Sequence, residues 1–359
     1  MKEKKSVLRV LKRILTVILV ILLILSVANM IAAKFIYDSL FPRFDSSDFY
    51  DAYYPTYEEI MDEYPRKEVG YLCGENRLQG YIYGEGQKGL VVIAPGLSSG
   101  ARDYIGITMS LVDFGWRVFA FDPTGAYESE GESSVGFAQE IIDLEATLEY
   151  IRSDKELKNL ELFILGHSRG GYAAACVLNS GFDISGIVTI SGVNSAMEIT
   201  IDSSKKHIGR LAYFGYPALY AYQSFIFGTE LTQISAAESL NNSLCPALVI
   251  QGEDDDVTPV DTCSIFAHRD EITNPNVEYM LITEDDRSGH TTLMYSSDSA
   301  VYREDVTKDF YTLSDKYPEG IPEDVEDDFL ETIDDRMTCK VDPGFMEQIN
   351  SFFEKNLTK

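Results

Sequence analysis

Residues 161–171, Glu-Leu-Phe-Ile-Leu-Gly-His-Ser-Arg-Gly-Gly, decide the fold of this chain. The apolar run at 162–165 is typical of a buried parallel strand, and the Ala-rich run at 172–178 is typical of a helix. Between them stands Gly-x-Ser-x-Gly, a sharp turn whose glycines let the strand and the helix approach closely. Such a turn holds the serine hydroxyl clear of the sheet edge, so the sequence predicts Ser168 as a nucleophile.

The same alternation of strand and helix patterns extends along most of the chain. Further apolar strands are predicted at 89–94, 117–121, 184–190, 247–251 and 277–282, and an antiparallel pair at 71–73 and 78–83. Helices are predicted at 103–114, 136–151 and 343–353. The alternation predicts an α/β fold over residues 67–359, with a mostly parallel central sheet flanked by helices on both faces.

The N-terminus joins a basic segment to a long apolar run. Residues 1–13 carry six Lys and Arg side chains, and residues 14–34 are predominantly apolar. A bilayer core is spanned by about 20 apolar residues, whereas the apolar part of a signal peptide has about 7–15. The sequence therefore predicts a transmembrane helix that anchors the chain in the cell membrane. The basic segment should be cytoplasmic, and everything after Lys34 should be extracytoplasmic. A signal peptide cleaved near Ala33 is the alternative.

Three other segments depart from the strand–helix alternation. Residues 35–66, rich in Asp, Tyr and Pro, are predicted to be a juxtamembrane connector with one short helix near 57–64 and no catalytic chemistry. Residues 194–242 form an aromatic helical insertion, which is either a cap over the substrate or a plain packed excursion. Residues 291–342 form an acidic insertion that lacks the spacing of a calcium loop, so a solvated face is expected.

Charge and cysteine usage restrict the possible partners. The formal net charge is −28, so nucleic acid would be repelled over most of the surface. The five cysteines show no spacing typical of zinc ligands, and no metal site is expected. In an extracytoplasmic domain Cys263 and Cys339 are plausible disulfide partners, and buried free thiols are the alternative.

A serine nucleophile needs a histidine base and a carboxylate that orients it. After a Gly-x-Ser-x-Gly turn the chain order is serine, acid, histidine, which leaves His268 and His290 of the four histidines. His268 falls in a helical run directly after the acidic loop, whereas Ser-Gly-His290 is a flexible loop after a strand, so His290 is the predicted base. The acid should come from the four carboxylates at 253–256, and spacing alone leaves open which one.

An acyl-transfer site also needs two backbone N–H groups that hold the developing oxyanion. One should belong to Arg169, directly after the nucleophile. The other should belong to Leu97, in the loop that follows the predicted strand 89–94, where Gly96 permits the turn.

From about Val69 to the C-terminus these residues resemble the α/β-hydrolase fold enzymes. Residues 95–97 resemble the oxyanion loop, residues 122–131 resemble the Asp-x-x-Gly-x-Gly-x-Ser-x-Gly loop, and Ser168 matches the nucleophile. The motif at 252–259 is similar to the acid motif and singles out Asp255, and Gly289-His290 matches the base. Pro95 stands where the family often has histidine, and Ala126 replaces a usual glycine. The long acidic insertion after His290 is also atypical, and it could cover the site or bind a partner.

Together these features predict a membrane-anchored serine hydrolase whose catalytic residues are Ser168, Asp255 and His290, with the oxyanion held at Leu97 and Arg169. A small-molecule acyl substrate with a carboxylic ester bond is expected, with no metal or organic cofactor. A peptidase, an amidase or an acyltransferase would use the same residues. An anchored, non-catalytic binding module is the alternative of another class.

Overall fold

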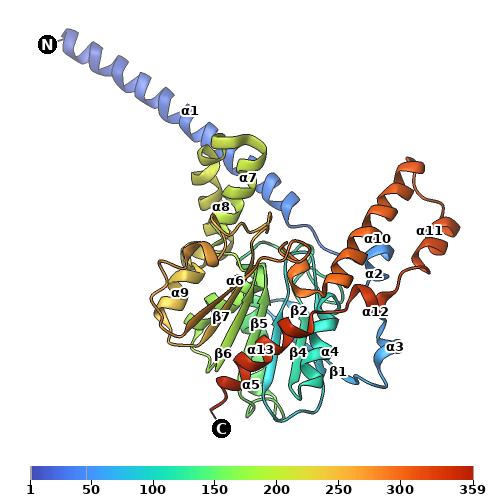
Figure 1. The fold of residues 1–359 in the computed structure, drawn as a ribbon. Coiled ribbons are helices and arrows are strands. Elements are labelled where there is room, and N and C mark those ends of the chain that lie inside the picture. The colour runs from blue at the N-terminus through green and yellow to red at the C-terminus, as the bar shows by residue number, and fades with distance from the viewer. Residues whose placement is uncertain (1, 46, 359) are drawn as a thin grey trace.

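The computed structural model describes residues 2–45 and 47–358, so Met1 of the predicted basic segment and the C-terminal Lys359 lie outside the described residues. A single eight-stranded sheet has the strand order β1-β2-β4-β3-β5-β6-β7-β8. Strand β2 runs antiparallel to both β1 and β4, and the other pairs are parallel. The predicted α/β architecture with a mostly parallel sheet is confirmed (Figure 1).

All predicted strands are present, with ends shifted by a few residues. They are β1 (Arg66–Cys73), β2 (Asn76–Tyr83), β3 (Leu90–Ala94), β4 (Arg117–Asp122), β5 (Leu162–His167), β6 (Gly186–Ile190), β7 (Ala247–Gly252) and β8 (Val277–Ile282). The five parallel strands β3 to β7 are buried along almost their whole length. This burial explains why their sequences read as continuous apolar runs rather than as alternating ones.

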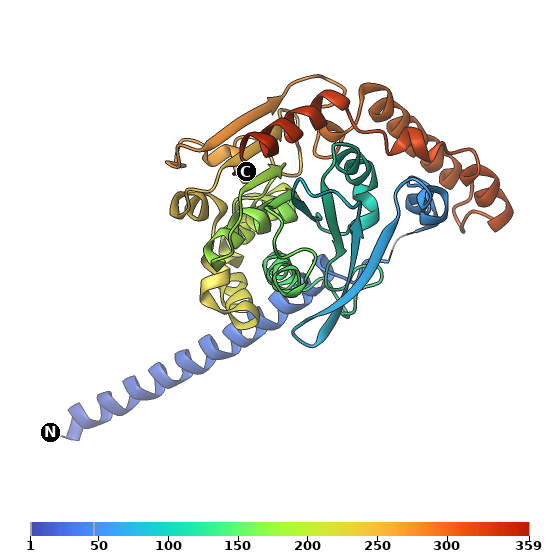
Figure 2. The same ribbon diagram turned by 90° about the horizontal axis from the view of Figure 1, so that it is seen from below.

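Helices cover the sheet on both faces (Figure 2). One face carries α5 (Gln139–Ser153) and α6 (Arg169–Cys176), and the other carries α4 (Ile105–Asp113) and α13 (Pro343–Lys355). Successive side chains of β3 enter different apolar clusters: Val92 packs with α5 and α6, while Val91 and Ile93 pack with α4 and α13. The two-residue period of a strand thus divides the core into two layers.

The juxtamembrane connector is part of the core and not a loose tether. It holds two short helices, α2 (Asp48–Asp51) and α3 (Tyr57–Ile60), so the helix predicted near 57–64 is present but covers only four residues. The Phe49 ring stacks on Phe310 with ring centroids 3.8 Å apart, and Tyr53 is 2% exposed. The connector therefore closes one side of the domain.

The aromatic insertion is helical, as expected. It contains α7 (Ala196–Ile208), α8 (Ala212–Gln233) and α9 (Ala236–Asn242). The long N-terminal helix α1 (Lys2–Leu40) packs on α8 and projects away from the domain (Figure 1).

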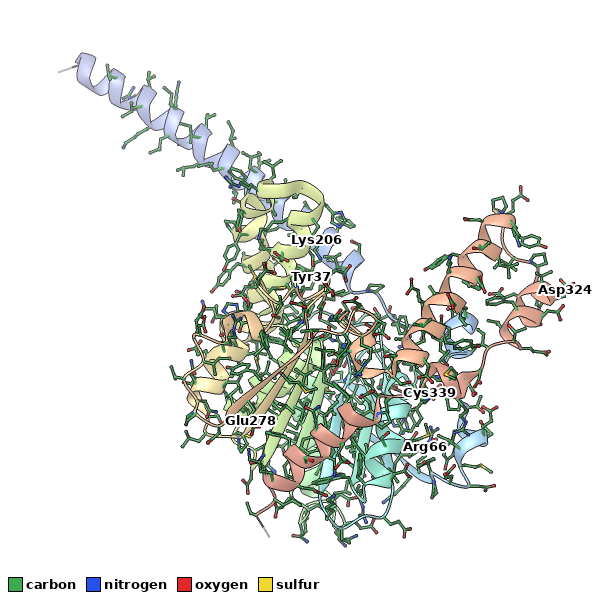
Figure 3. All side chains as sticks on the ribbon, viewed as in Figure 1. Tyr37, Arg66, Lys206, Glu278, Asp324 and Cys339 are labelled. Atoms are coloured by element: carbon green, nitrogen blue, oxygen red, sulfur yellow. The ribbon has the colours of Figure 1, made fainter. Side chains whose placement is uncertain are left out.

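The acidic insertion forms a second helical projection, made of α10 (Ser297–Lys316), α11 (Glu323–Leu330) and α12 (Asp335–Thr338). Asp324 lies near its outer end (Figure 3), and the carboxylates of residues 323, 324, 327 and 328 are exposed. This exposure agrees with the solvated face expected from the charge pattern.

The suggested disulfide is wrong. Cys263 and Cys339 are both free and buried, and they belong to different apolar clusters that lie on opposite faces of the sheet. A disulfide requires Cα atoms within about 7 Å of each other, which this separation by the sheet prevents.

Candidate active site

Ser168 stands in a strained turn between β5 and α6. Its backbone angles, φ 55° and ψ −114°, lie in a region that residues with a side chain rarely adopt. The flanking glycines are required by contact distance: a Cβ on Gly166 would lie 2.2 Å from the Gly170 oxygen, and one on Gly170 would lie 2.0 Å from the Ala94 oxygen. The turn that the Gly-x-Ser-x-Gly motif predicted is therefore present in the expected strand–turn–helix setting.

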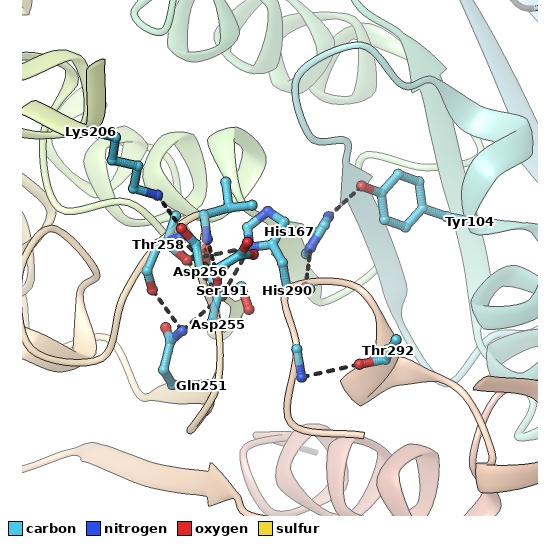
Figure 4. Close-up of polar contacts among 12 residues, drawn as sticks. Tyr104, His167, Ser191, Lys206, Gln251, Asp255, Asp256, Thr258, His290 and Thr292 are labelled. Atoms are coloured by element: carbon cyan, nitrogen blue, oxygen red, sulfur yellow. Dashed lines mark hydrogen bonds and ion pairs between the residues drawn. The ribbon is translucent and has the colours of Figure 1, made fainter. Parts of the chain in front are cut away.

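Asp255 and His290 meet after the ends of β7 and β8 (Figure 4). The Nδ1 atom of His290 lies 3.0 Å and 2.9 Å from the two carboxylate oxygens of Asp255. The carboxylate also accepts hydrogen bonds from the backbone N–H groups of Val257 and Thr258 and from the Thr258 hydroxyl. Burial raises the pKa of Asp255, but the hydrogen bonds and the His290 charge outweigh it and lower the pKa to about 2. Asp255 is therefore a fixed anion beneath the imidazole.

The neighbouring carboxylates have other surroundings. Asp254 accepts a hydrogen bond from the Ser288 hydroxyl at 2.6 Å, and Asp256 is exposed. Crowded like charges are thus relieved by burying one carboxylate and leaving another in water.

Ser168 and His290 line one cavity of about 390 Å³. No hydrogen bond joins the Ser168 hydroxyl to His290 among the described residues, although both residues line the same cavity. Catalytic hydrogen bonds are often long in structures without a substrate and shorten when the substrate binds.

Of the two residues whose amides are expected to hold an oxyanion, only Leu97 lines this cavity. Arg169 is the first residue of α6, where backbone N–H groups have no partner inside the helix. Neither amide donates a hydrogen bond to another residue in the part of the chain that the structure describes. The adjacent Gly96 amide donates to the Tyr104 hydroxyl at 2.9 Å and fixes the loop.

The Arg169 side chain points away from the cavity into the core. Its guanidinium forms an ion pair of 2.6 Å with Glu140 of α5, and both side chains are at most 1% exposed. Burial raises the pKa of Glu140, while the Arg169 charge opposes that rise. The ion pair therefore connects the residue that follows Ser168 to α5.

Sequence reasoning missed a hydrogen-bonded chain beside the site. The Tyr104 hydroxyl lies 2.8 Å from Nδ1 of His167, and Nε2 of His167 lies 3.0 Å from the backbone oxygen of His290 (Figure 4). A carbonyl only accepts hydrogen bonds, so Nε2 carries the proton and Nδ1 accepts from the tyrosine. No spacing in the sequence indicates this chain, because Tyr104 and His167 are 63 positions apart.

The remaining cavity walls come from the connector, which was expected to carry no catalytic chemistry, and from the acidic insertion, which was expected either to cover the site or to bind a partner. Phe44, Tyr50 and Tyr54 of the connector and Tyr295 and Arg303 of the acidic insertion line the cavity at Ser168. The guanidinium of Arg303 lies 4.2 Å from the centroid of the Tyr295 ring. The many tyrosines of the connector were the feature of the sequence that could have indicated its contribution to the cavity. No residue of 194–242 lines this cavity, so the cap does not cover Ser168 as one interpretation of its aromatic residues suggested.

The other histidines lie elsewhere. His268 lines a larger cavity of about 850 Å³ between the cap and the domain, where its ring nitrogens lie 3.2 Å from Glu198 and from Glu271. His207 is exposed near the end of α7. Among residues 2–45 and 47–358, no group of three or more His, Cys, Asp or Glu side chains is placed to hold a metal ion.

Comparison with known proteins agrees with this arrangement. Residues 85–224 match the model of the serine aminopeptidase S33 family, and none of the curated proteins compared with the chain is significantly similar to it. An esterase from Pyrococcus furiosus, Pf2001, is similar in fold: in one crystal form it superposes with a TM-score of 0.55 at 19% identity, over 88% of this chain and 96% of the esterase. A second crystal form gives a TM-score of 0.56 at 16% identity, over 88% and 98% of the two chains. The sheet order, the strained serine turn and these similarities lead to one conclusion: the chain has the α/β-hydrolase fold, and its residues 85–224 resemble a family of serine hydrolases.

Proposed function

We propose that this protein is a membrane-anchored serine hydrolase that cleaves carboxylic esters through Ser168, His290 and Asp255. The observation that carries the proposal is the Asp255–His290 pair on the wall of the cavity that also exposes the strained Ser168. A buried carboxylate that holds Nδ1 leaves Nε2 of the imidazole available as a base. A hydrolase of this kind needs those three groups and a space for the substrate.

In the proposed reaction the Ser168 oxygen attacks the ester carbonyl while Nε2 of His290 takes the hydroxyl proton. The tetrahedral oxyanion accepts hydrogen bonds from the amides of Leu97 and Arg169. As the bond to the leaving oxygen breaks, the imidazolium returns the proton, and the alcohol departs from an acyl-serine. Water then attacks the acyl-serine with His290 again as base, which releases the acid and restores Ser168.

The cavity walls favour an ester of an apolar or aromatic acyl group. Leu97, Met294 and the tyrosines of the connector surround Ser168, and burial of apolar surface stabilises such a group by roughly 25 cal/mol per Å². Similarity in fold to an esterase supports the same choice, whereas the match to an aminopeptidase family favours an amide.

Helix α1 is the proposed anchor, with the catalytic domain extracytoplasmic. Residues 9–40 form one helix whose most apolar 18-residue window has a mean hydropathy of 2.9, and the domain buries none of that window. Apolar side chains such as Leu15 and Leu23 are more than half exposed, which suits surrounding lipid and not water. The partial burial of Met30 and Ala33 against the domain supports a retained helix over a cleaved signal peptide.

Labelling of the full-length protein in detergent with a fluorophosphonate, followed by mass mapping of the adduct, tests the proposal. The reagent should modify Ser168 alone, and both Ser168→Ala and His290→Ala should abolish the adduct. Ser99→Ala is the matched control because the Ser99 side chain lines the same cavity, and it should label normally. A folded protein that stays unlabelled would favour the binding-module alternative. Short-chain and long-chain esters assayed beside aminoacyl amides then separate an esterase from a peptidase.

A further inference from the structure

Helix α8 has an exposure pattern that is unusual for a domain in water. Residues 212–227 contain no charged side chain, and a helix that is apolar all round is expected to be buried. Yet Phe214 is 84% exposed and Phe225 is 82% exposed. The exposed positions 211, 214, 217, 221 and 225 recur at helical spacing and make one stripe, hereafter the α8 stripe.

The other faces of α8 are turned toward the domain, with Tyr213 55% and Tyr216 43% exposed. Tyr213, Tyr216 and Tyr220 line the cavity between the cap and the domain, and Leu219, Ile226 and Phe227 join the apolar core. The stripe is therefore a remaining face with nothing on it in the described part of the chain. Exposed apolar patches rimmed by polar residues mark sites of interaction with proteins or membranes.

The position of α8 selects a membrane as the occupant. Helix α1 packs on α8, and Tyr37 of α1 contacts Tyr222 with ring centroids 5.3 Å apart. Met30 and Ala33, which lie within the apolar run predicted to cross the bilayer, are partly buried against the same apolar cluster. The cap consequently stands beside the end of the proposed membrane span (Figure 1).

Charge at the end of α7 agrees with this choice. In a chain of net charge −28, basic side chains cluster in the last turn of α7 and in the turn that follows it: Lys205, Lys206, His207 and Arg210. Lys206 and Arg210 are exposed, and Figure 3 places Lys206 on the part of the molecule from which α1 emerges. Basic side chains next to exposed aromatic ones are typical of helices that lie in a membrane interface.

We infer that the α8 stripe lies in the phospholipid interface of the membrane that α1 spans, with the basic cluster at the headgroups. The inference depends on the proposed anchoring by α1 and not on the proposed catalysis. The domain is then held against the bilayer by two elements, a spanning helix and a cap that lies in the interface.

The single tryptophan of the chain makes a direct test possible. Trp116 is 0% exposed in the core, so its emission is shielded from bromine atoms in the lipid. Phe214→Trp and Phe225→Trp each add an indole on the stripe. Full-length variants are reconstituted in nanodiscs of ordinary phospholipid and of phospholipid brominated on its acyl chains, and the loss of the added emission is compared. Tyr311→Trp is the matched control, because Tyr311 is an exposed aromatic residue on α10.

Both stripe variants should lose most of the added emission in brominated lipid, while Tyr311→Trp keeps it. Equal emission in the two lipids at both stripe positions would overturn the inference. A blue-shifted emission without bromine quenching would also overturn it, since a second protein chain would then cover the stripe. Leu23→Trp in α1 separates the two proposals: if it too is unquenched, anchoring by α1 fails, whereas quenching only at position 23 refutes the cap contact alone.

Discussion

The Tyr104 hydroxyl donates a hydrogen bond of 2.8 Å to Nδ1 of His167, the residue that immediately precedes Ser168. Because the same hydroxyl accepts the Gly96 amide, Tyr104 joins the oxyanion loop to the serine turn. The second nitrogen of His167 in turn holds the backbone of His290. These hydrogen bonds therefore fix the relative positions of three loops that are distant in the sequence and that surround one cavity.

Removal of this hydroxyl should slow catalysis without removing a catalytic group. Tyr104→Phe leaves the Gly96 amide and Nδ1 of His167 without a partner, and we expect kcat to fall about 10-fold, the effect of about 1.4 kcal/mol in the barrier. Tyr71→Phe is the control, since it deletes an equally buried hydroxyl that bonds Thr147 in the core. Steady-state kinetics with a soluble ester should separate the two variants, and equal kcat values would show that the link does not position the site.

His167 should make the fold sensitive to mild acid. Burial, together with the His290 charge, lowers the pKa of His167 to about 3, so the folded protein resists protonation that the unfolded chain accepts below about pH 6.5. Stability present above pH 6.5 is thus lost as the pH falls, by about 2 kcal/mol between pH 6.5 and 5. The lowered pKa of Asp255, about 2, contributes stability that is fully present above its ordinary pKa of about 3.8 and is lost only as the pH falls below that value.

Thermal unfolding at pH 7 and pH 5 measures this loss. His167→Gln keeps a donor for the His290 carbonyl but has no imidazole to titrate, so its midpoint should change much less than that of the natural protein over the same interval. An identical drop in both proteins would place the acid sensitivity elsewhere.

Asp255 should be essential to turnover although it does not touch the substrate. Asp255→Asn keeps the side-chain size but removes the charge that orients the imidazole, and a fall in kcat of about 10,000-fold is expected, by analogy with the serine triad. Asp256→Asn alters an exposed carboxylate one position along and should leave kcat unchanged. Burst kinetics with an activated ester would report the slowed acylation, and near-normal acylation by Asp255→Asn would contradict the assigned role.

The buried Arg169–Glu140 pair should stabilise the fold because each side chain neutralises the charge of the other. Glu140→Gln leaves the fully buried guanidinium without its counter-charge, which costs about 3–5 kcal/mol in such pairs. Glu149→Gln, in the exposed pair with Arg152 on the same helix, should cost less than about 1 kcal/mol. Unfolding midpoints of the two variants provide the comparison, and similar small shifts would mean that the buried pair is solvated or rearranged.

The sequence alone determined the sheet and the serine turn. The apolar runs of β3 to β7 are long enough to identify as strands because both of their faces are buried, and Gly166 is dictated by its contact with Gly170 within the turn itself. The candidate residues Ser168, Asp255 and His290 were chosen from motifs whose signals lie within a few positions of each other.

Only the tertiary structure decided what surrounds them. The tyrosines of the connector and Arg303 of the acidic insertion reach the cavity, and Tyr104 reaches His167, through contacts between residues from 63 to over 200 positions apart, which no local pattern records. The disulfide suggestion failed for the same reason, since cysteine spacing says nothing about the side of the sheet on which each thiol lies. Local backbone preferences and the spacing of buried apolar residues can be recognised in short stretches of sequence. Contacts between distant segments depend on how the whole core packs.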